Sequence, residues 1–180
     1  VKFSSAEFTY NGEVQKPELQ TSLTAEDYSA VYSDESSKIV GPYTVTVTGK
    51  GNYTGSVTCT YTIKKANGSG SVTMADYTYG EAAPAPVAES ATNGTGTDQV
   101  SYHYTGDSDT GVHYDSDKAP TDAGSYTVTV SFKENDNYND CTATANFTVH
   151  PKGLVADKFT LSQTEFTYNG EAQKPTVSAA

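Results

Sequence analysis

The sequence predicts an all-β protein made of β-sandwich modules in tandem. Two observations carry this prediction: a repeated segment, and strand-like alternation of side chains in equivalent places. The heptad EFTYNGE at Glu7–Glu13 recurs verbatim at Glu165–Glu171, and a partial copy, YTYGE, lies at 77–81. A chain that restarts the same unit is an array of modules.

Alternating residues indicate the strands of each module. Segments 43–48 (YTVTVT) and 126–132 (YTVTVSF) place Tyr and Val on one face and Thr or Ser on the other, as in a half-buried antiparallel sheet. A polar Asn-Tyr turn and a second alternating segment follow each of them, at 56–64 and 141–150, which predicts a hairpin at the end of each module. With middle strands at 27–32 and 100–104, each module has about six or seven short strands, typical of an immunoglobulin-like β-sandwich.

Three regions follow from the repeat spacing. Residues 1–65 are predicted to form one immunoglobulin-like module, residues 66–150 a second, and residues 151–180 the incomplete first strands of a third. The junctions are short, so we expect neighbouring modules to touch end to end. Because a lone hairpin is marginal in water, residues 154–180 are expected either to stay flexible or to add strands to an exposed sheet edge of the second module or of another molecule.

Charge and composition restrict the function classes. The chain has 180 residues and a net charge of −11, and residues 67–150 hold only two lysines against twelve acidic residues. Nucleic acid would be repelled by this surface, since phosphate contacts need Lys and Arg. A membrane-spanning helix needs about 18 or more consecutive apolar residues, and the sequence has no such run. Cys59 and Cys141 fall on the apolar face of predicted strands, which favours free buried thiols over a disulfide between modules and leaves the redox compartment open.

An acidic insert, Thr105–Pro120, distinguishes the second module from the first. Closely spaced carboxylates with a glycine bend can supply several of the oxygen ligands that Ca²⁺ requires. The complete twelve-residue calcium-loop pattern is absent, so a solvated loop is the other interpretation. The candidate calcium ligands are Asp107, Asp109, Asp115 and Asp117; no other cofactor is indicated.

Fourteen tyrosines allow a glycan-binding interpretation, because sugars stack on aromatic faces. The candidate glycan ligands are Tyr102, Tyr104 and Tyr114. The alternative is structural, since Tyr43, Tyr61 and Tyr126 lie on the predicted core face, and Tyr53 and Tyr138 occupy equivalent turns, as packing residues would. The three histidines, His103, His113 and His150, match no zinc motif and are expected at exposed positions.

The two modules resemble known surface repeats. The first, from Phe8 through the string GKGNYTG at 49–55, is similar to bacterial immunoglobulin-like repeats of long secreted and cell-wall proteins of gut Firmicutes. The second, with YTYG at 77–80 and AGSYTVTV at 123–130, resembles "YGX" or mucin-binding-type surface repeats. These motifs specify a scaffold and transfer no catalytic residue. The resemblance implies an extracellular location, on a bacterial cell surface or secreted.

Function is therefore expected to be non-catalytic. The favoured interpretation is a structural spacer or stalk that presents adhesive domains, with other repeats of the same polypeptide as partners. The alternative is an adhesin module that binds a host or dietary glycan or glycoprotein. No nucleophile elbow or phosphate-binding loop appears, so an enzyme is the least favoured class.

Overall fold

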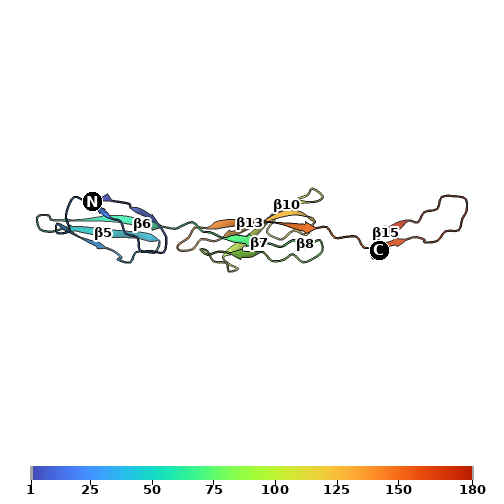
Figure 1. Ribbon diagram of the computed structural model, residues 1–180, viewed down its shortest axis with the longest axis horizontal. Coiled ribbons are helices and arrows are strands. Elements are labelled where there is room, and N and C mark those ends of the chain that lie inside the picture. The colour runs from blue at the N-terminus through green and yellow to red at the C-terminus, as the bar shows by residue number, and fades with distance from the viewer. Residues whose placement is uncertain (1, 180) are drawn as a thin grey trace.

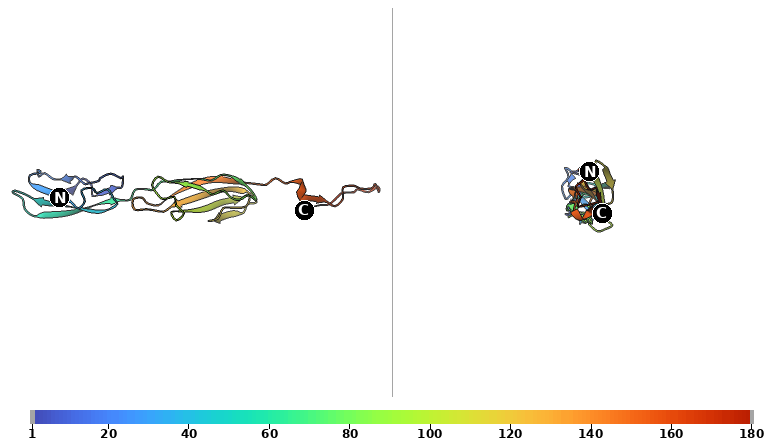
Figure 2. Two further views of the ribbon diagram at one scale, coloured as in Figure 1. Left: turned by 90° about the horizontal axis from the view of Figure 1, so that it is seen from below. Right: turned by 90° about the vertical axis from the view of Figure 1, so that its right-hand side faces the viewer.

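The computed structural model describes residues 2–179 and confirms the all-β class. Its helical content is a single 3-10 turn, η1 (Ala156–Lys158), and every other element in the described residues is a strand. The strands lie in three groups along one long axis (Figures 1 and 2). We call residues 2–65 the first unit, residues 66–150 the second unit and residues 151–179 the tail. Among the described residues, no sheet combines strands of different groups.

The first unit has two layers. Its sheet has the order β2-β6-β5-β4, in which β2 runs parallel to β6 and the other neighbours are antiparallel; β1 and β3 form a separate antiparallel ribbon. Val45, Tyr61 and Ile63 are at most 1 % exposed and form the centre of the core. The strands are β1 (Lys2–Phe3), β2 (Glu7–Thr9), β3 (Leu19–Gln20), β4 (Tyr28–Tyr32), β5 (Gly41–Gly49) and β6 (Ser56–Lys64).

The second unit repeats this plan with one more strand. Its sheet has the order β11-β10-β12-β13-β8, with β8 parallel to β13, and the β7–β9 ribbon packs against β12 and β13. The six and seven strands of the two units agree with the number expected from the sequence. They are β7 (Ser71–Thr73), β8 (Tyr77–Thr78), β9 (Val87–Glu89), β10 (Val100–Ser108), β11 (His113–Ser116), β12 (Gly124–Phe132) and β13 (Cys141–His150).

Period-two alternation places the core of the second unit. Along β12 every second residue is buried, from Tyr126 to Phe132, while the Ser and Thr between them lie on the other face. Phe147 from β13 stacks on Tyr126 with ring centroids 5.8 Å apart. Burial among these residues also raises the pKa of the Tyr77 phenol to about 12. The buried cluster comprises Val72, Tyr77, Tyr104, Tyr126, Val128, Val130, Phe132, Phe147 and Val149.

One tyrosine fixes the start of the long central strand in each unit. The Tyr43 hydroxyl donates to the Ile39 carbonyl at 2.7 Å, and the Tyr126 hydroxyl donates to the Asp122 carbonyl at 2.9 Å. Both bonds reach back four residues along the chain, as in the tyrosine corner of β-sandwiches. The two units therefore share a local device as well as a strand order.

Two expectations need correction. The solvated-loop interpretation of the insert 105–120 is wrong for much of its length, because β10 continues to Ser108 and β11 pairs with it. Polar edge strands carry little apolar periodicity, so the sequence gives no strand signal there. Cys59 and Cys141 are free thiols, as favoured, although both are half-buried rather than fully buried; burial raises the pKa of the Cys141 thiol.

Candidate functional site

The β10–β11 hairpin contains most of the residues singled out in the acidic insert. Asp107 lies opposite His113, and Thr105 lies opposite Asp115. The close approach of β10 to β12 requires a glycine at Gly106, where φ is +151° and a Cβ atom would lie 2.4 Å from the Ser125 carbonyl oxygen. Along β10 and β11 the polar residues alternate with core-facing ones, so they share the outward face of the hairpin.

Imidazole–carboxylate pairs organise this outward face. His103 Nδ1 lies 2.7 Å from Asp117 Oδ1, and its Nε2 lies 2.9 Å from Asp115 Oδ1. His113 Nδ1 lies 2.9 Å from Asp107 Oδ1. The hydrogen bond to Asp117, together with the charge of Asp115, raises the pKa of His103 above its ordinary value. When protonated, His103 therefore ties β10 to β11 and to the residues that follow it.

The four predicted calcium ligands do not converge. Asp115 and Asp117 flank His103, whereas Asp107 pairs with His113. Asp109 lies in the exposed turn between the strands, where its N–H donates to the Ala123 carbonyl. Within residues 2–179, no group of three His, Cys, Asp or Glu side chains is arranged to hold a metal ion. The insert therefore forms a hairpin whose carboxylates are spread over its outward face, and it is not the solvated loop that was the alternative to a calcium site.

The three candidate glycan-binding tyrosines point toward the core. Tyr104 is only 5 % exposed, and its ring packs edge-on against Phe147 at 6.2 Å. Tyr102 and Tyr114 are partly buried against the same cluster. The Tyr114 hydroxyl donates to the Lys118 carbonyl at 2.8 Å. These rings therefore do not form a solvent-facing stacking platform.

The second candidate site is the junction between the two units. Residue Ala66 forms an isolated parallel bridge with Tyr138 of the β12–β13 turn. Its N–H donates to the Asn137 carbonyl at 2.9 Å, and its carbonyl accepts from the Asn139 N–H at 2.8 Å. The linker thus enters the second unit as a hydrogen-bonded element.

Side chains add to the junction from both units. The rings of Tyr10 and Tyr138 pack edge to face with centroids 5.4 Å apart, a geometry favoured by the ring quadrupoles. Lys65 Nζ lies 2.8 Å from Glu134 Oε2. Tyr138 therefore packs as the sequence suggested, but its counterpart Tyr53 is 48 % exposed at the outer turn of the first unit.

Two asparagine side chains, one buried and one partly buried, shape the turn that receives the linker. Asn93 is 6 % exposed, and its Nδ2 donates to the carbonyls of Lys133 and Asn139 at 2.8 and 3.0 Å. Asn135 Oδ1 accepts from the N–H groups of Asn137 and Tyr138 at 3.0 and 2.9 Å. Sequence reasoning missed both residues, because a polar turn gives no sign of which amides fold inward.

Glycine makes the linker's approach possible. A Cβ atom at Gly68 would lie 2.5 Å from both the Asn139 carbonyl oxygen and Asn93 Oδ1, closer than real Cβ contacts allow. The string Gly68-Ser69-Gly70 therefore lets the backbone run along the turn. The sequence predicts only a short junction here, and the structure shows that these glycines pack closely against the turn.

Comparison with known proteins bears on the first unit. Residues 1–67 match the family model of the MBG domain, a family of bacterial surface-associated domains. No curated protein and no solved structure gives a match. The helical content of the described residues is the three-residue turn η1, which is far too short to span a bilayer. Over its first 67 residues, the chain is thus similar to the MBG domain, a domain type that is typical of proteins at the bacterial cell surface.

Proposed function

We propose that this chain is a non-catalytic spacer of a bacterial cell-surface or secreted protein, in which β-sandwich repeats stacked end to end hold adhesive domains away from the surface. The observation that carries the proposal is the bonded junction between the units. A spacer must resist bending where its modules meet. Here an aromatic pair and an ion pair join the two units, and the backbone bridge of Ala66 fixes the linker to the second unit.

The shape of the molecule supports the same proposal. The first unit and the tail lie at opposite ends of the long axis, and the long strands run roughly along it (Figures 1 and 2). Length along the axis therefore grows with each added repeat.

Surface display tests the spacer role directly. Residues 1–153 would be placed between a cell anchor and a reporter binding domain, and compared with a Gly/Ser linker of equal residue number. The flexible linker has an r.m.s. span of only about 70 Å at this length. We expect cells with the repeats to capture large reporter-coated beads and cells with the linker to lose most of that capture. Equal capture by both would contradict the proposal.

Binding of a mucin-like glycoprotein is the second candidate, and the similarity of residues 1–67 to the MBG domain is the observation that favours it. The inward orientation of Tyr102, Tyr104 and Tyr114 makes the second unit a poor location for such a site. A glycan and mucin array probed with the full chain would separate the candidates. Saturable binding that survives deletion of residues 109–112 would place a ligand site outside the hairpin and replace the spacer role as the main function.

A further inference from the structure

Strand β4 leaves one side of its backbone without a strand partner. It is the last strand of the first unit's sheet, and among the described residues it pairs only with β5. The Ser33 N–H donates to the Thr44 carbonyl at 2.8 Å. Bonded and non-bonded residues alternate along an antiparallel pair, so the N–H and C=O groups of Tyr28, Ala30 and Tyr32 point away from β5. These groups form a free edge of the sheet.

The tail does not cover this edge. Its strands β14 (Phe159–Leu161) and β15 (Val177–Ala179) pair with each other, so within the described residues the tail adds no strand to either unit of its own chain. The second unit lies between the tail and the first unit (Figure 1). A strand that covers β4 must therefore come from another molecule.

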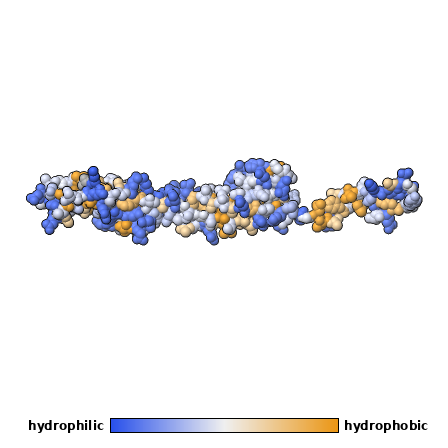
Figure 3. All heavy atoms as spheres, turned by 45° about the horizontal axis from the view of Figure 1, so that its top comes forward, coloured by the Kyte–Doolittle hydropathy of each residue, from blue (hydrophilic) through white to orange (hydrophobic). Residues whose placement is uncertain are grey.

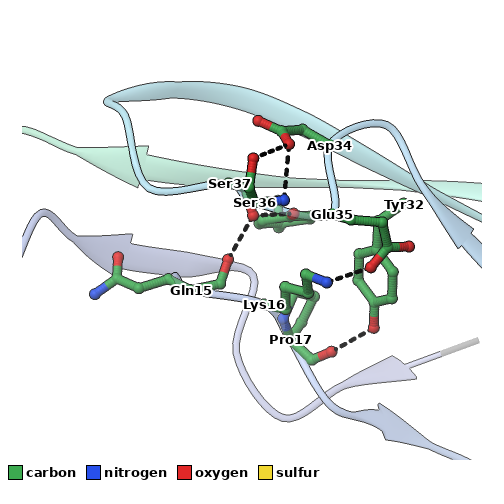
Figure 4. Close-up of polar contacts among 9 residues, drawn as sticks. Gln15, Lys16, Pro17, Tyr32, Asp34, Glu35, Ser36 and Ser37 are labelled. Carbon is green, nitrogen blue, oxygen red and sulfur yellow. Dashed lines mark hydrogen bonds and ion pairs between the residues drawn. The ribbon is translucent and has the colours of Figure 1, made fainter. Parts of the chain in front are cut away.

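One side chain approaches the end of the edge (Figure 4). The Glu35 carboxylate accepts from Lys16, and this bond lowers the pKa of Glu35 below its ordinary value, with a smaller contribution from the Tyr32 N–H. The Glu35 side chain is 70 % exposed. It is therefore free to turn away from the edge when another strand approaches.

The sequence of β4 lacks the features that usually block an edge strand. Charged side chains, proline and bulges keep such strands from pairing with other chains. Residues 28–33 read YSAVYS, without charge or proline, and β4 pairs with β5 without a bulge. In the second unit, the position of Val31 is taken by His103, which contacts Asp115 and Asp117. The edge is therefore charged in the second unit and uncharged in the first.

Apolar side chains offer the first unit no broad alternative contact on the face that Figure 3 shows, where hydrophilic residues separate them. Val31, in the middle of β4, is 64 % exposed, but single exposed apolar residues are common on protein surfaces. An association at this edge therefore depends mainly on backbone hydrogen bonds, to which Val31 adds apolar contact.

Strand β4, with the sequence YSAVY, is complementary to a second copy of itself. In an antiparallel pair centred on Ala30, Tyr28 of one copy lies opposite Tyr32 of the other, and the two Ala30 residues face each other. Each of these residues exchanges both backbone bonds with its opposite residue, so every outward N–H and C=O group gains a partner. Val31 lies opposite Ser29 on the outward face, and the cross-strand tyrosine pairs stabilise the other face.

The distribution of charge favours this antiparallel arrangement. Residues 1–65 hold six lysines against seven acidic residues, whereas residues 67–150 hold two lysines against twelve. The long strands run roughly along the long axis (Figures 1 and 2). Antiparallel pairing at β4 therefore joins the two nearly neutral units and points the two acidic units in opposite directions. Parallel pairing places the acidic units side by side, where they repel each other.

We propose that the free edge of β4 is an interaction surface for a second copy of this chain, and that two copies pair antiparallel through residues 28–32 into one continuous sheet. The two molecules then point in opposite directions along the long axis. Given the spacer role proposed above, on which this step rests, such pairs join molecules that extend from two facing surfaces. A strand of five residues makes a small contact, and many copies on each surface strengthen the attachment.

Hydrogen exchange of the full chain tests the register. We expect the N–H groups of Tyr28, Ala30 and Tyr32 to exchange more slowly as the protein concentration rises, because they bond to the second copy. The N–H groups of Ser29 and Val31 already bond to β5 and should change less. Sedimentation should show a monomer–dimer equilibrium over the same range. A chain that stays monomeric, or slower exchange that omits the three outward groups, would overturn the proposal.

Added salt should strengthen the pair. In this register Asp34 of one copy lies towards Glu26 of the other at both ends of the paired segment, and these like charges repel each other. Salt screens such exposed charges, so the dimer fraction should rise with ionic strength. A dimer fraction that falls as salt is added indicates a contact held by ion pairs and contradicts the assigned register.

A charge swap at Val31 tests the surface without disturbing the fold. Val31→Lys and Val31→Glu should each abolish dimerisation and leave both melting transitions unchanged, because the pair brings the two substituted side chains to diagonal positions about 7–8 Å apart. An equal mixture of the two variants should dimerise again. Val14→Lys, at a valine that is 51 % exposed outside β4, is the control and should dimerise like the native chain. Failure of the mixture to associate would overturn the proposal.

Single spin labels determine the orientation of the pair. In a Cys59→Ala/Cys141→Ala background, a label at Thr60 of the first unit should show dipolar coupling between copies. A label at Thr144 of the second unit should show none, because the second units lie at opposite ends of the dimer. Coupling between Thr144 labels would show parallel pairing and overturn the proposal. These measurements use the chain in solution, so their result does not depend on the spacer role.

Discussion

The two units share a strand order but differ in the side chains that form their cores. In the second unit, nine apolar residues form one buried cluster. In the first unit, the fully buried apolar residues are Pro17, Val45, Tyr61 and Ile63, and Ser37 is buried as well. The core position of Phe147 is taken in the first unit by Tyr61, whose hydroxyl lies 2.9 Å from Ser37 Oγ. One plan thus supports an apolar core and a partly polar core.

The sheet edges differ as well. Strand β4 is an open edge in the first unit, and its Val31 is 64 % exposed. In the second unit the same edge is covered by β11, whose outward residues include His113 and Asp115. Exposed edge strands invite pairing with other chains, and charged or short strands prevent it. The insert therefore protects the second unit, and we expect the first unit to be the less stable one.

The largest expected effect comes from the aromatic centre of the second unit. Phe147 packs against Tyr77, Tyr104 and Tyr126, so Phe147→Ala leaves a cavity among three rings. Such changes cost about 3–5 kcal/mol. Calorimetry of the full chain should show the later of two transitions shifting to or below the earlier one. A shift in the earlier transition alone would reverse the order of stability argued above.

The polar core of the first unit gives the next largest effect. Ser37→Ala leaves the Tyr61 hydroxyl and the Gln15 carbonyl without their partner, and an unsatisfied buried group costs about 1–3 kcal/mol. Urea unfolding should show this loss in the first unit only. The double variant Ser37→Ala/Tyr61→Phe removes the stranded hydroxyl and should recover part of the stability. A double variant that is less stable than Ser37→Ala would contradict this explanation.

Sequence pattern predicts the parts of this fold that depend on local alternation. The strands 43–48 and 126–132 and the hairpins that follow appear as expected. One face of each strand is apolar, and the period of two determines which residues lie on that face. The same parity places Tyr102 and Tyr104 with Val100 on the core side of β10. Applying the same alternation to Tyr102 and Tyr104 predicts that their side chains pack in the core instead of binding a glycan.

The remaining features depend on contacts that a local pattern does not contain. Strand β11 has the sequence HYDS, and its pairing with β10 comes from register and from imidazole–carboxylate contacts across the hairpin. The junction depends on Asn93, 40 residues or more from the carbonyls that it bonds. The structural roles of such polar residues depend on tertiary contacts, so the neighbouring residues in the sequence do not reveal those roles.

Removing a ring at the junction should loosen the units without unfolding them. Tyr138→Ala deletes the edge-to-face pair with Tyr10, a contact worth about 0.5–1.5 kcal/mol. We expect double electron–electron resonance between labels at Thr60 and Thr144 to show a broader distance distribution, with both melting transitions nearly unchanged. Tyr53→Ala, at the equivalent outer turn, is the control and should leave the distribution as it is. Equal broadening by both variants would remove Tyr138 from the junction.

The smallest effect concerns the charged edge of the second unit. Because the folded pKa of His103 is raised by Asp117 and Asp115, its contribution to stability is fully present below the unfolded value near 6.5 and is lost as pH rises through the folded pKa. Amide exchange of β11 should therefore be slower at pH 5.5 than at pH 8.5, after correction for intrinsic rates. His103→Gln should remove this difference.

The Asp117→Asn variant distinguishes the effect of His103 protonation from a general effect of low pH on the sheet. Its side chain keeps the shape of Asp117 but loses the charge, so the pKa of His103 should fall and the change in β11 protection should move to lower pH. Nuclear magnetic resonance titration of the His103 ring measures that pKa directly. If Asp117→Asn leaves the titration of His103 in place, the ion pairs across the hairpin do not stabilise this edge, and the protection of the second unit rests on the backbone pairing of β11 alone.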